Sequence, residues 1–182
     1  MGKGRNGRFI GDRMTAAHSG IMNLQIEWEK PVPLRKAPRR ARKGSLYIYK
    51  VDLEVLPAVP GIYVFARRWS KSYEALYVGQ STNIRKRVRN HLKNLPLMKY
   101  LENAKTGRRF VIVGRAVPKP GQKLEKVLAT LERAFIRHFL SEGHALVNKQ
   151  GTRIRRHEIF SEGRVPKSFV PTWMYLEKAK GQ

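Results

Sequence analysis

The stretch from 60 to 90, PGIYVFARRWSKSYEALYVGQSTNIRKRVRN, decides the fold. It begins with the strand-forming residues 61–65, crosses a polar turn, and continues with a second apolar run at 75–78. Gly79 ends this second run, and the Ser-Thr-Asn sequence at 81–83 offers side chains that cap the start of a helix. The stretch therefore predicts a β-hairpin that leads directly into a helix.

The helix after Gly79 is predicted to be amphipathic, because its apolar residues recur at helical spacing: Ile84, Val88, Leu92 and Leu95. At about 100° per residue, Arg87 and His91 fall together on one flank of this apolar stripe. His91 alone is equally well interpreted as a residue at the core boundary, but beside Arg87 and two hairpin tyrosines it favours a role at a phosphate. Arg85 and Arg89 fall on the opposite flank, where they indicate contacts to a nucleic-acid backbone or solvated charges.

A second, longer helix is predicted over residues 122–142. On a helical wheel Glu132 falls inside the apolar arc of this helix, between Phe139 and Ile136. A carboxylate within an apolar arc is costly unless it has a partner, so a bound cation or a buried arginine is implied. The alternative interpretation is a glutamate that forms a salt bridge at the edge of the core.

Shorter patterns complete the predicted core. A short helix is expected over 96–104, a central strand over 109–113 and a short strand over 145–148. The run 46–49 also has strand character. The aromatic segment Phe169 to Tyr175 is expected to pack on the core or to mediate self-association, and Ile21 to Trp28 is expected to form a strand or an anchor on the core.

The charge of the chain points to a polyanionic partner. Its 182 residues include 38 Lys and Arg against 13 Asp and Glu, a formal net charge of +25, and this repulsion opposes the compact state. Nucleic acid is the leading partner and an anionic membrane surface the second. No basic helix with a broad apolar face favours the membrane, so no membrane partner is expected.

Other classes of protein are disfavoured by composition. The chain has no cysteine, so it has neither disulfides nor a cysteine-based zinc site. No apolar run approaches the ~18 residues that span a bilayer, and the N-terminus lacks the apolar segment of a secretory signal. We therefore predict a cytoplasmic protein with one good core, since 41% hydrophobic content over this length does not favour two.

Basic segments flank the predicted core. Residues 1–44 are expected to form an extended basic arm or linker, 45–151 the core and 152–182 a C-terminal extension. The sequence PVPLRKAPRRARKG at 31–44 contains three prolines, six cations and no acid. It is interpreted either as a solvated linker or as an arm that tracks phosphates, and the charge favours the arm. The phosphate contacts expected there are Arg39, Arg40, Arg42 and Lys43.

The organising stretch resembles the signature of the GIY-YIG nuclease family. Gly-Ile-Tyr stands at 61–63, and Tyr-Val-Gly at 77–79 is followed by a basic helix. The resemblance extends over about 60–151 and includes four further positions, where the family has an arginine, a histidine, a metal-binding glutamate and a late asparagine: Arg87, His91, Glu132 and Asn148. Val78 replaces the usual isoleucine, and the interval between the two tyrosines is longer than usual.

The resemblance implies an α+β sandwich: a small mixed or antiparallel sheet of about three core strands, flanked by helices and extended at both ends by basic segments. It also implies a catalytic set of Tyr63, Tyr77, Arg87, His91, Glu132 and Asn148. Tyr63 would be the general base beside Tyr77, Arg87 would hold the scissile phosphate and stabilise the phenolate, and His91 would orient a tyrosine or the water. Asn148 would brace the site, and Glu132 would bind one Mg²⁺ or Mn²⁺ ion.

The predicted function is a divalent-metal-dependent DNA endonuclease, of restriction or defence type. It would act on double-stranded DNA as a homodimer, without a nucleotide cofactor. The main alternative is a non-catalytic nucleic-acid-binding protein associated with the ribosome or with DNA, and an RNA-cleaving enzyme is a third. Glu132 distinguishes the first two, because a pure binder gains nothing from a carboxylate that faces phosphate.

Overall fold

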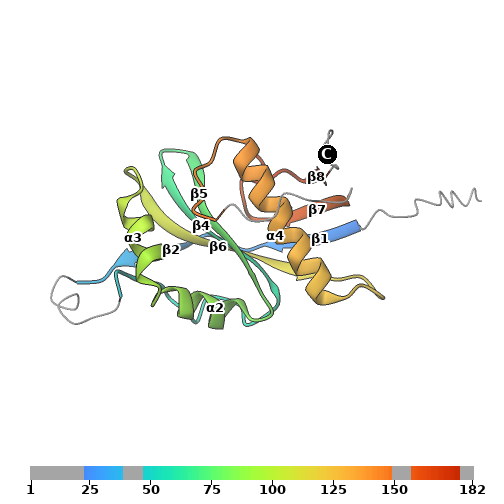
Figure 1. Ribbon diagram of the computed structural model, residues 1–182, viewed down its shortest axis with the longest axis horizontal. Coiled ribbons are helices and arrows are strands. Elements are labelled where there is room, and N and C mark those ends of the chain that lie inside the picture. The colour runs from blue at the N-terminus through green and yellow to red at the C-terminus, as the bar shows by residue number, and fades with distance from the viewer. Residues whose placement is uncertain (1–22, 39–46, 149–156, 177–182) are drawn as a thin grey trace, which may run out of the picture.

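The computed structural model describes residues 23–38, 47–148 and 157–176 (Figure 1). Its strands are β1 (Asn23–Trp28), β2 (Val32–Lys36), β3 (Tyr49–Lys50), β4 (Gly61–Trp69), β5 (Ser72–Ser81), β6 (Arg108–Val117), β7 (His157–Gly163) and β8 (Trp173–Leu176). Its helices are α2 (Ile84–His91), α3 (Leu95–Asn103) and α4 (Leu124–Ser141). The predicted phosphate contacts Arg39, Arg40, Arg42 and Lys43 lie outside the described residues.

The predicted hairpin is present as β4 and β5, which pair antiparallel from Gly61 opposite Ser81 to Trp69 opposite Ser72. Both strands are longer than predicted, because polar residues at the far end of the hairpin continue the pairing. The prediction that Gly79 ends the second strand is wrong, since β5 remains paired with β4 as far as Ser81. The register shifts once, so that Leu76 is an extra residue on β5. A β-bulge of this kind bends a strand and redirects the side chains next to it.

Strand β6 is the centre of the sheet. It pairs with β4 along one edge, while along its other edge β1 pairs with residues 114–117 and β2 with residues 109–111. Strand β1 then pairs in parallel with β7, whose other neighbour is the antiparallel β8. The short β3 pairs antiparallel with the end of β2. The mixed α+β class is confirmed, with three helices in the described residues.

The expected number of about three strands is wrong: the described residues form an eight-stranded sheet. The additional strands come largely from segments at both ends of the chain. In β1, every second residue is buried, namely Leu24, Ile26 and Trp28. Strand β2 contains Pro33, whose missing N–H is tolerated because only one side of the strand is paired there. A proline-rich basic stretch can thus be extended and still belong to a sheet.

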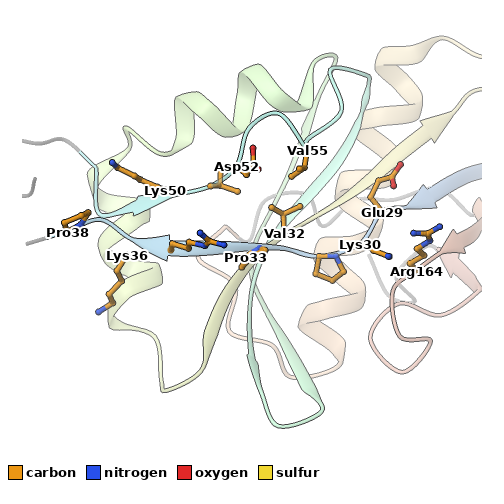
Figure 2. A pocket seen from close by; sticks show the side chains of 13 residues that line it. Glu29, Lys30, Val32, Pro33, Lys36, Pro38, Lys50, Asp52, Val55 and Arg164 are labelled. Atoms are coloured by element: carbon orange, nitrogen blue, oxygen red, sulfur yellow. The ribbon is translucent and has the colours of Figure 1, made fainter.

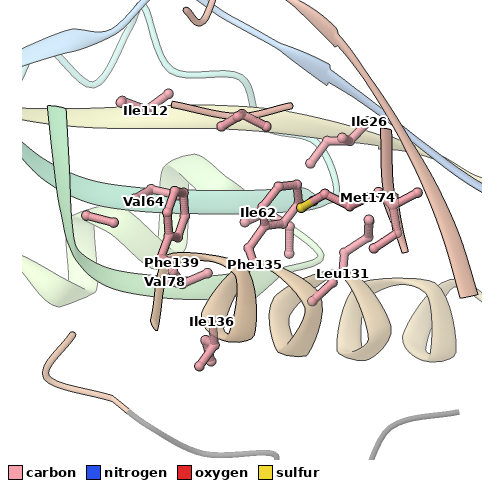
Figure 3. Close-up of a cluster of buried hydrophobic side chains, with 14 of the residues drawn as sticks. Ile26, Ile62, Val64, Val78, Ile112, Leu131, Phe135, Ile136, Phe139 and Met174 are labelled. Atoms are coloured by element: carbon pink, nitrogen blue, oxygen red, sulfur yellow. The ribbon is translucent and has the colours of Figure 1, made fainter. Parts of the chain in front are cut away.

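Alternate residues of the hairpin serve two separate cores. Ile62 and Val64 point to the face covered by α4, where they pack in a cluster with Phe135 and Phe139 (Figure 3). Tyr63 and Phe65 point to the opposite face, which α2 and α3 cover. The aromatic segment near the C-terminus joins the first cluster through its buried Phe169 and Met174.

The remaining predicted elements are found with changed limits. The predicted long helix is α4, and the short helix over 96–104 is α3, capped by Asn94. The helix after Gly79 ends at His91, and Leu95 begins α3 instead of continuing the apolar stripe. The strand predicted over 145–148 is wrong: only one backbone–backbone bond joins these residues to β5, and the other bonds there come from the Asn148 side chain. None of the helices within the described ranges is long and apolar enough to cross a membrane.

Candidate active site at the edge of the hairpin

The hairpin places two tyrosines side by side on the face covered by α2. Tyr63 is fully buried, and its ring lies 6.1 Å from that of Tyr77 with 25° between the planes. Gly79 stands directly opposite Tyr63, and a Cβ atom at this position would lie 2.2 Å from the Tyr63 hydroxyl oxygen. Glycine is therefore required here, because any side chain would occupy the space of the Tyr63 phenol.

Helix α2 brings a histidine and an arginine to these tyrosines. Of the three residues at 81–83 that the sequence offers as caps, Asn83 caps the helix, and its side chain accepts a hydrogen bond from the Lys86 N–H. One turn apart, Arg87 and His91 then face the hairpin. His91 Nε2 lies 2.7 Å from the Tyr63 hydroxyl, and its ring is 5.2 Å from that of Tyr77. The solvent-exposed guanidinium of Arg87 interacts with the same hydroxyl.

Burial keeps the Tyr63–His91 pair neutral. It raises the pKa of Tyr63 strongly, Tyr77 adds to that rise, and the nearby Arg87 opposes it without cancelling it. Burial and the positive charge of Arg87 lower the pKa of His91 to about 4. His91 Nδ1 is buried and has no hydrogen-bond partner among the described residues. At neutral pH the pair therefore consists of a phenol and an uncharged imidazole joined by one hydrogen bond.

Glu132 reaches the same region from the other side of the sheet. Its carboxylate on α4 is half-buried, and burial raises its pKa. A hydrogen bond from the backbone N–H of Gln80 and the charges of Arg87 and Arg133 act in the opposite direction. Within the described residues Glu132 forms no salt bridge. Of the two predicted partners, a bound cation or a buried arginine, the arginine is not found among the described residues, and the exposed Arg87 interacts with Glu132 only at longer range.

The outer edge of β5 explains how residues from two faces meet. Strand β5 pairs only with β4 in the described sheet, so alternate residues of β5 turn backbone groups outward. The Val147 N–H donates to the Leu76 carbonyl at 2.9 Å. The Asn148 side chain donates to the Val78 carbonyl at 2.6 Å and accepts from the Val78 N–H at 3.2 Å. The Asn148 side-chain amide thus satisfies both backbone groups of Val78, as a neighbouring strand would. Two residues farther along β5, the Gln80 N–H donates to the Glu132 carboxylate.

The structure brings the six predicted catalytic residues together around this edge. Four are linked directly by contacts on the α2 face: Tyr63, Tyr77, Arg87 and His91. Glu132 is electrostatically coupled to Arg87, and Asn148 joins the cluster through the backbone of β5. Sequence reasoning missed Gln80, because its contribution is a backbone N–H and only the outer position of β5 exposes that group.

The two flanking arginines of α2 have different surroundings. The Arg85 side chain donates to the Leu56 carbonyl at 2.7 Å and to the Glu54 carbonyl at 3.1 Å, and it forms a salt bridge with the Glu54 carboxylate at 3.2 Å. It fastens the loop before β4 to the helix. Arg89 is exposed and makes no ion pair with the described residues, which leaves its charge available to a ligand.

The donor set fits a hard divalent cation held by few protein ligands. No group of three or more His, Asp or Glu side chains gathers within the described ranges. A lone half-buried carboxylate does not build a zinc site, which needs three or four protein ligands. It does fit Mg²⁺, which commonly binds one or two carboxylates and completes its shell with water and phosphate oxygens. Glu132 is the residue that would hold it.

Comparison with known proteins adds no relative to this description. No protein-family model matches the chain, and neither the curated proteins nor the solved structures contain a significant match to it. The interpretation of the site therefore depends on its own geometry and on the motifs in the sequence.

Proposed function

We propose that this protein is a divalent-metal-dependent DNA endonuclease of the GIY-YIG type. The observation that carries the proposal is the meeting of three groups at one strand edge: the neutral Tyr63–His91 pair, the exposed Arg87 guanidinium and the half-buried Glu132 carboxylate. A base, a phosphate-binding cation and a metal ligand are the groups that phosphodiester hydrolysis needs. A protein with a formal charge of +25 is suited to a polyanionic substrate.

The hydrogen bond between Tyr63 and His91 supports a proton relay. Burial disfavours a free phenolate at Tyr63, so the tyrosine is a poor base by itself. Tyr63 is fully buried in the free protein, so substrate binding must first bring a water to its oxygen. The uncharged His91 Nε2 can then accept the phenolic proton while the Tyr63 oxygen takes a proton from that water. The resulting hydroxide would attack phosphorus, and the P–O bond to the leaving sugar oxygen would break. No phenolate is released at any stage of this relay.

The other groups of the cluster hold charge and position. Arg87 would bind the non-bridging oxygens of the scissile phosphate, where negative charge grows in the transition state. Bound Mg²⁺ or Mn²⁺ would stabilise the leaving oxygen. Glu132 would hold this ion on the α4 side, while Asn148 keeps the outer edge of β5 in register. The residues that act on the phosphate thus approach it from both faces of the sheet.

Cleavage of a nucleic-acid panel tests the proposal. Supercoiled plasmid, methylated plasmid, single-stranded DNA and RNA are incubated with the protein and Mg²⁺, and the ends are mapped. The wild type and Glu125→Ala, a matched change at an exposed glutamate on α4, should cut duplex DNA. Glu132→Ala should bind DNA but not cut it, because the metal acts mainly on the transition state. Equal cutting by Glu132→Ala would remove this residue from the site, and binding without cleavage by the wild type would favour the non-catalytic alternative.

We also propose that the enzyme acts on DNA as a homodimer, because one site cuts one strand and two-fold symmetry supplies a second site. The structure narrows the surface for such an assembly. Leu24, Ile26, Phe169 and Met174 are buried in the chain's own core, so they do not form an interface. Trp173 of the same aromatic segment is 54% exposed, so its side chain remains available for an interface. Sedimentation with and without DNA tests the dimer, and a monomer in both states would contradict it.

A further inference from the structure

The structure contains a positively charged surface in addition to the candidate active site. It lies along β2, which is separated from the outer edge of β5 by the width of β6 and β4. It is an open groove of about 810 Å³ between β2 and the loop that follows β3 (Figure 2). Val32 and Pro33 of β2 lie along its middle, with Val55 above them in the view. Lys50 stands at one end and Arg164 at the other.

Most cations of this groove lack partners among the described residues, whereas its acids have them. The side chains of Lys30, Arg35, Lys50 and Arg164 are exposed and form no ion pair with the residues the structure describes. By contrast, Glu29 forms a salt bridge with Arg115 at 3.0 Å, and Asp52 accepts a hydrogen bond from the Glu54 N–H at 3.1 Å. The described lining carries five cations against two acids, and Asp52 keeps its charge because a backbone N–H does not neutralise it, so the groove presents a net positive charge.

The lining excludes several kinds of ligand. Pro31 and Pro33 have no N–H to offer, so an extended peptide could not add a full strand along this part of β2. Among the described residues the lining contains no aromatic side chain, so this part of the groove lacks the stacking platforms that hold unpaired bases. Cations spread along an open groove instead match the repeated charges of a phosphate backbone.

We propose that this groove binds the phosphate backbone of duplex DNA next to the segment that is cut. The choice of DNA rests on the proposed function, whereas the groove's charge does not. Three strand spacings separate β2 from β5, about 14 Å, while one turn of duplex is about 34 Å long, so one duplex is long enough to contact both places. The groove wall is also tied to the candidate active site, because Arg85 of α2 holds residues 54 and 56 of the loop.

Removal of the groove's charge tests the proposal independently of cleavage. All binding is measured without divalent metal in the Glu132→Ala background, over a series of salt concentrations. The groove variant combines Lys30→Gln, Arg35→Gln, Lys50→Gln and Arg164→Gln. The matched control carries the same loss of charge at exposed lysines elsewhere: Lys119→Gln, Lys123→Gln, Lys126→Gln and Lys167→Gln.

The groove variant should bind duplex DNA at least about tenfold more weakly than the control at 0.1 M salt. Its log–log salt slope should be shallower by ~0.9 for each phosphate that is no longer neutralised. Equal affinity and slope in the two variants would overturn the proposal, as would a weakening confined to RNA. If the wild type does not cut DNA but the groove variant still binds duplex DNA more weakly than the control, the proposed nuclease function is wrong while the groove remains a DNA-binding surface.

A second measurement locates the DNA directly. Because the chain has no cysteine, Val55→Cys provides one attachment point in the groove for an iron chelate that generates hydroxyl radicals. DNA bound by this labelled protein should be broken within about one helical turn of the cleavage site. The control, Lys126→Cys on α4, should give no such breaks. An identical pattern from both labels, or no breaks from Val55→Cys, would contradict the groove assignment.

Discussion

The two faces of the sheet are built for different purposes. Under α4, side chains such as Ile62, Leu131 and Phe135 form an apolar cluster (Figure 3). Under α2, the same hairpin contributes Tyr63 and Phe65, and here the buried layer includes His91. The hydroxyl and the imidazole satisfy each other at 2.7 Å, although one ring nitrogen lacks a described partner. The α4 face is thus closed by apolar packing, while the α2 face buries a polar pair within an otherwise apolar cluster.

The largest effect on stability is expected on the apolar face. Phe135 is fully buried and meets Trp28 edge to face, with ring centroids 5.1 Å apart. Phe135→Ala should lower the free energy of unfolding by about 3–5 kcal/mol, since it leaves a cavity. Phe160→Ala, at a partly exposed ring on β7, is the control and should cost much less. Urea denaturation compares the two, and equal losses would contradict the assignment of Phe135 to the main core.

The polar face should make the fold sensitive to acid. Because the folded state lowers the pKa of His91 from 6.5 to about 4, the unfolded chain binds more protons between these values. Stability is therefore full above pH 6.5 and falls as the pH drops toward 4, by on the order of 3 kcal/mol. Burial also lowers the pKa values of His138 and His144, whose rings pack against Phe139 under α4, so the other face adds to the same trend.

The variant His91→Gln isolates the His91 part of this trend. Its free energy of unfolding, measured in urea at a series of pH values, should depend less steeply on pH between 4 and 6.5 than that of the wild type. Parallel curves for the two proteins would mean that His91 is not held neutral by burial.

A smaller effect on stability is expected when Gly79, which leaves room for the Tyr63 ring, is replaced. In Gly79→Ala the new methyl group would overlap the Tyr63 phenol, so the ring must shift away from His91. Overpacking of this kind costs about 1–3 kcal/mol in stability, and the displaced hydroxyl should slow cleavage by about 100-fold. Gly121→Ala is a control in open space, although its positive φ adds local strain. If Gly79→Ala cuts DNA at the wild-type rate, cleavage does not depend on the position of the Tyr63 ring.

The smallest effect is predicted for the link between α2 and the preceding loop. Arg85→Gln removes three interactions with residues 54 and 56, but the site is partly exposed and water can replace them. The loss should be about 1 kcal/mol, with cleavage changed only a few-fold. Thermal unfolding and initial rates measure it. A loss of activity comparable to that of Arg87→Gln would instead place Arg85 at the phosphate.

The candidate site was more predictable than the sheet. The hairpin, the Asn83 cap and the positions of Arg87 and His91 follow from local spacing, which the sequence displays directly. Strand β2 and the contact of Asn148 with Val78 depend on which strands lie at an edge, and that is a property of the whole sheet. The prolines at 31 and 33 indicated an arm because their compatibility with a half-paired strand is visible only in three dimensions.

The most direct measurement of the central proposal is the single-turnover cleavage rate of Tyr63→Phe. Tyr100→Phe is the matched control, because its hydroxyl also donates a hydrogen bond, to the Ala145 carbonyl at 2.6 Å, but lies outside the catalytic cluster. Both variants should fold and bind DNA as the wild type does. Tyr63→Phe should cut roughly 10²–10⁴-fold more slowly, because the relay from water to His91 loses its oxygen, while Tyr100→Phe should cut normally. Wild-type cleavage by Tyr63→Phe would contradict the proposal and make Tyr63 a packing residue.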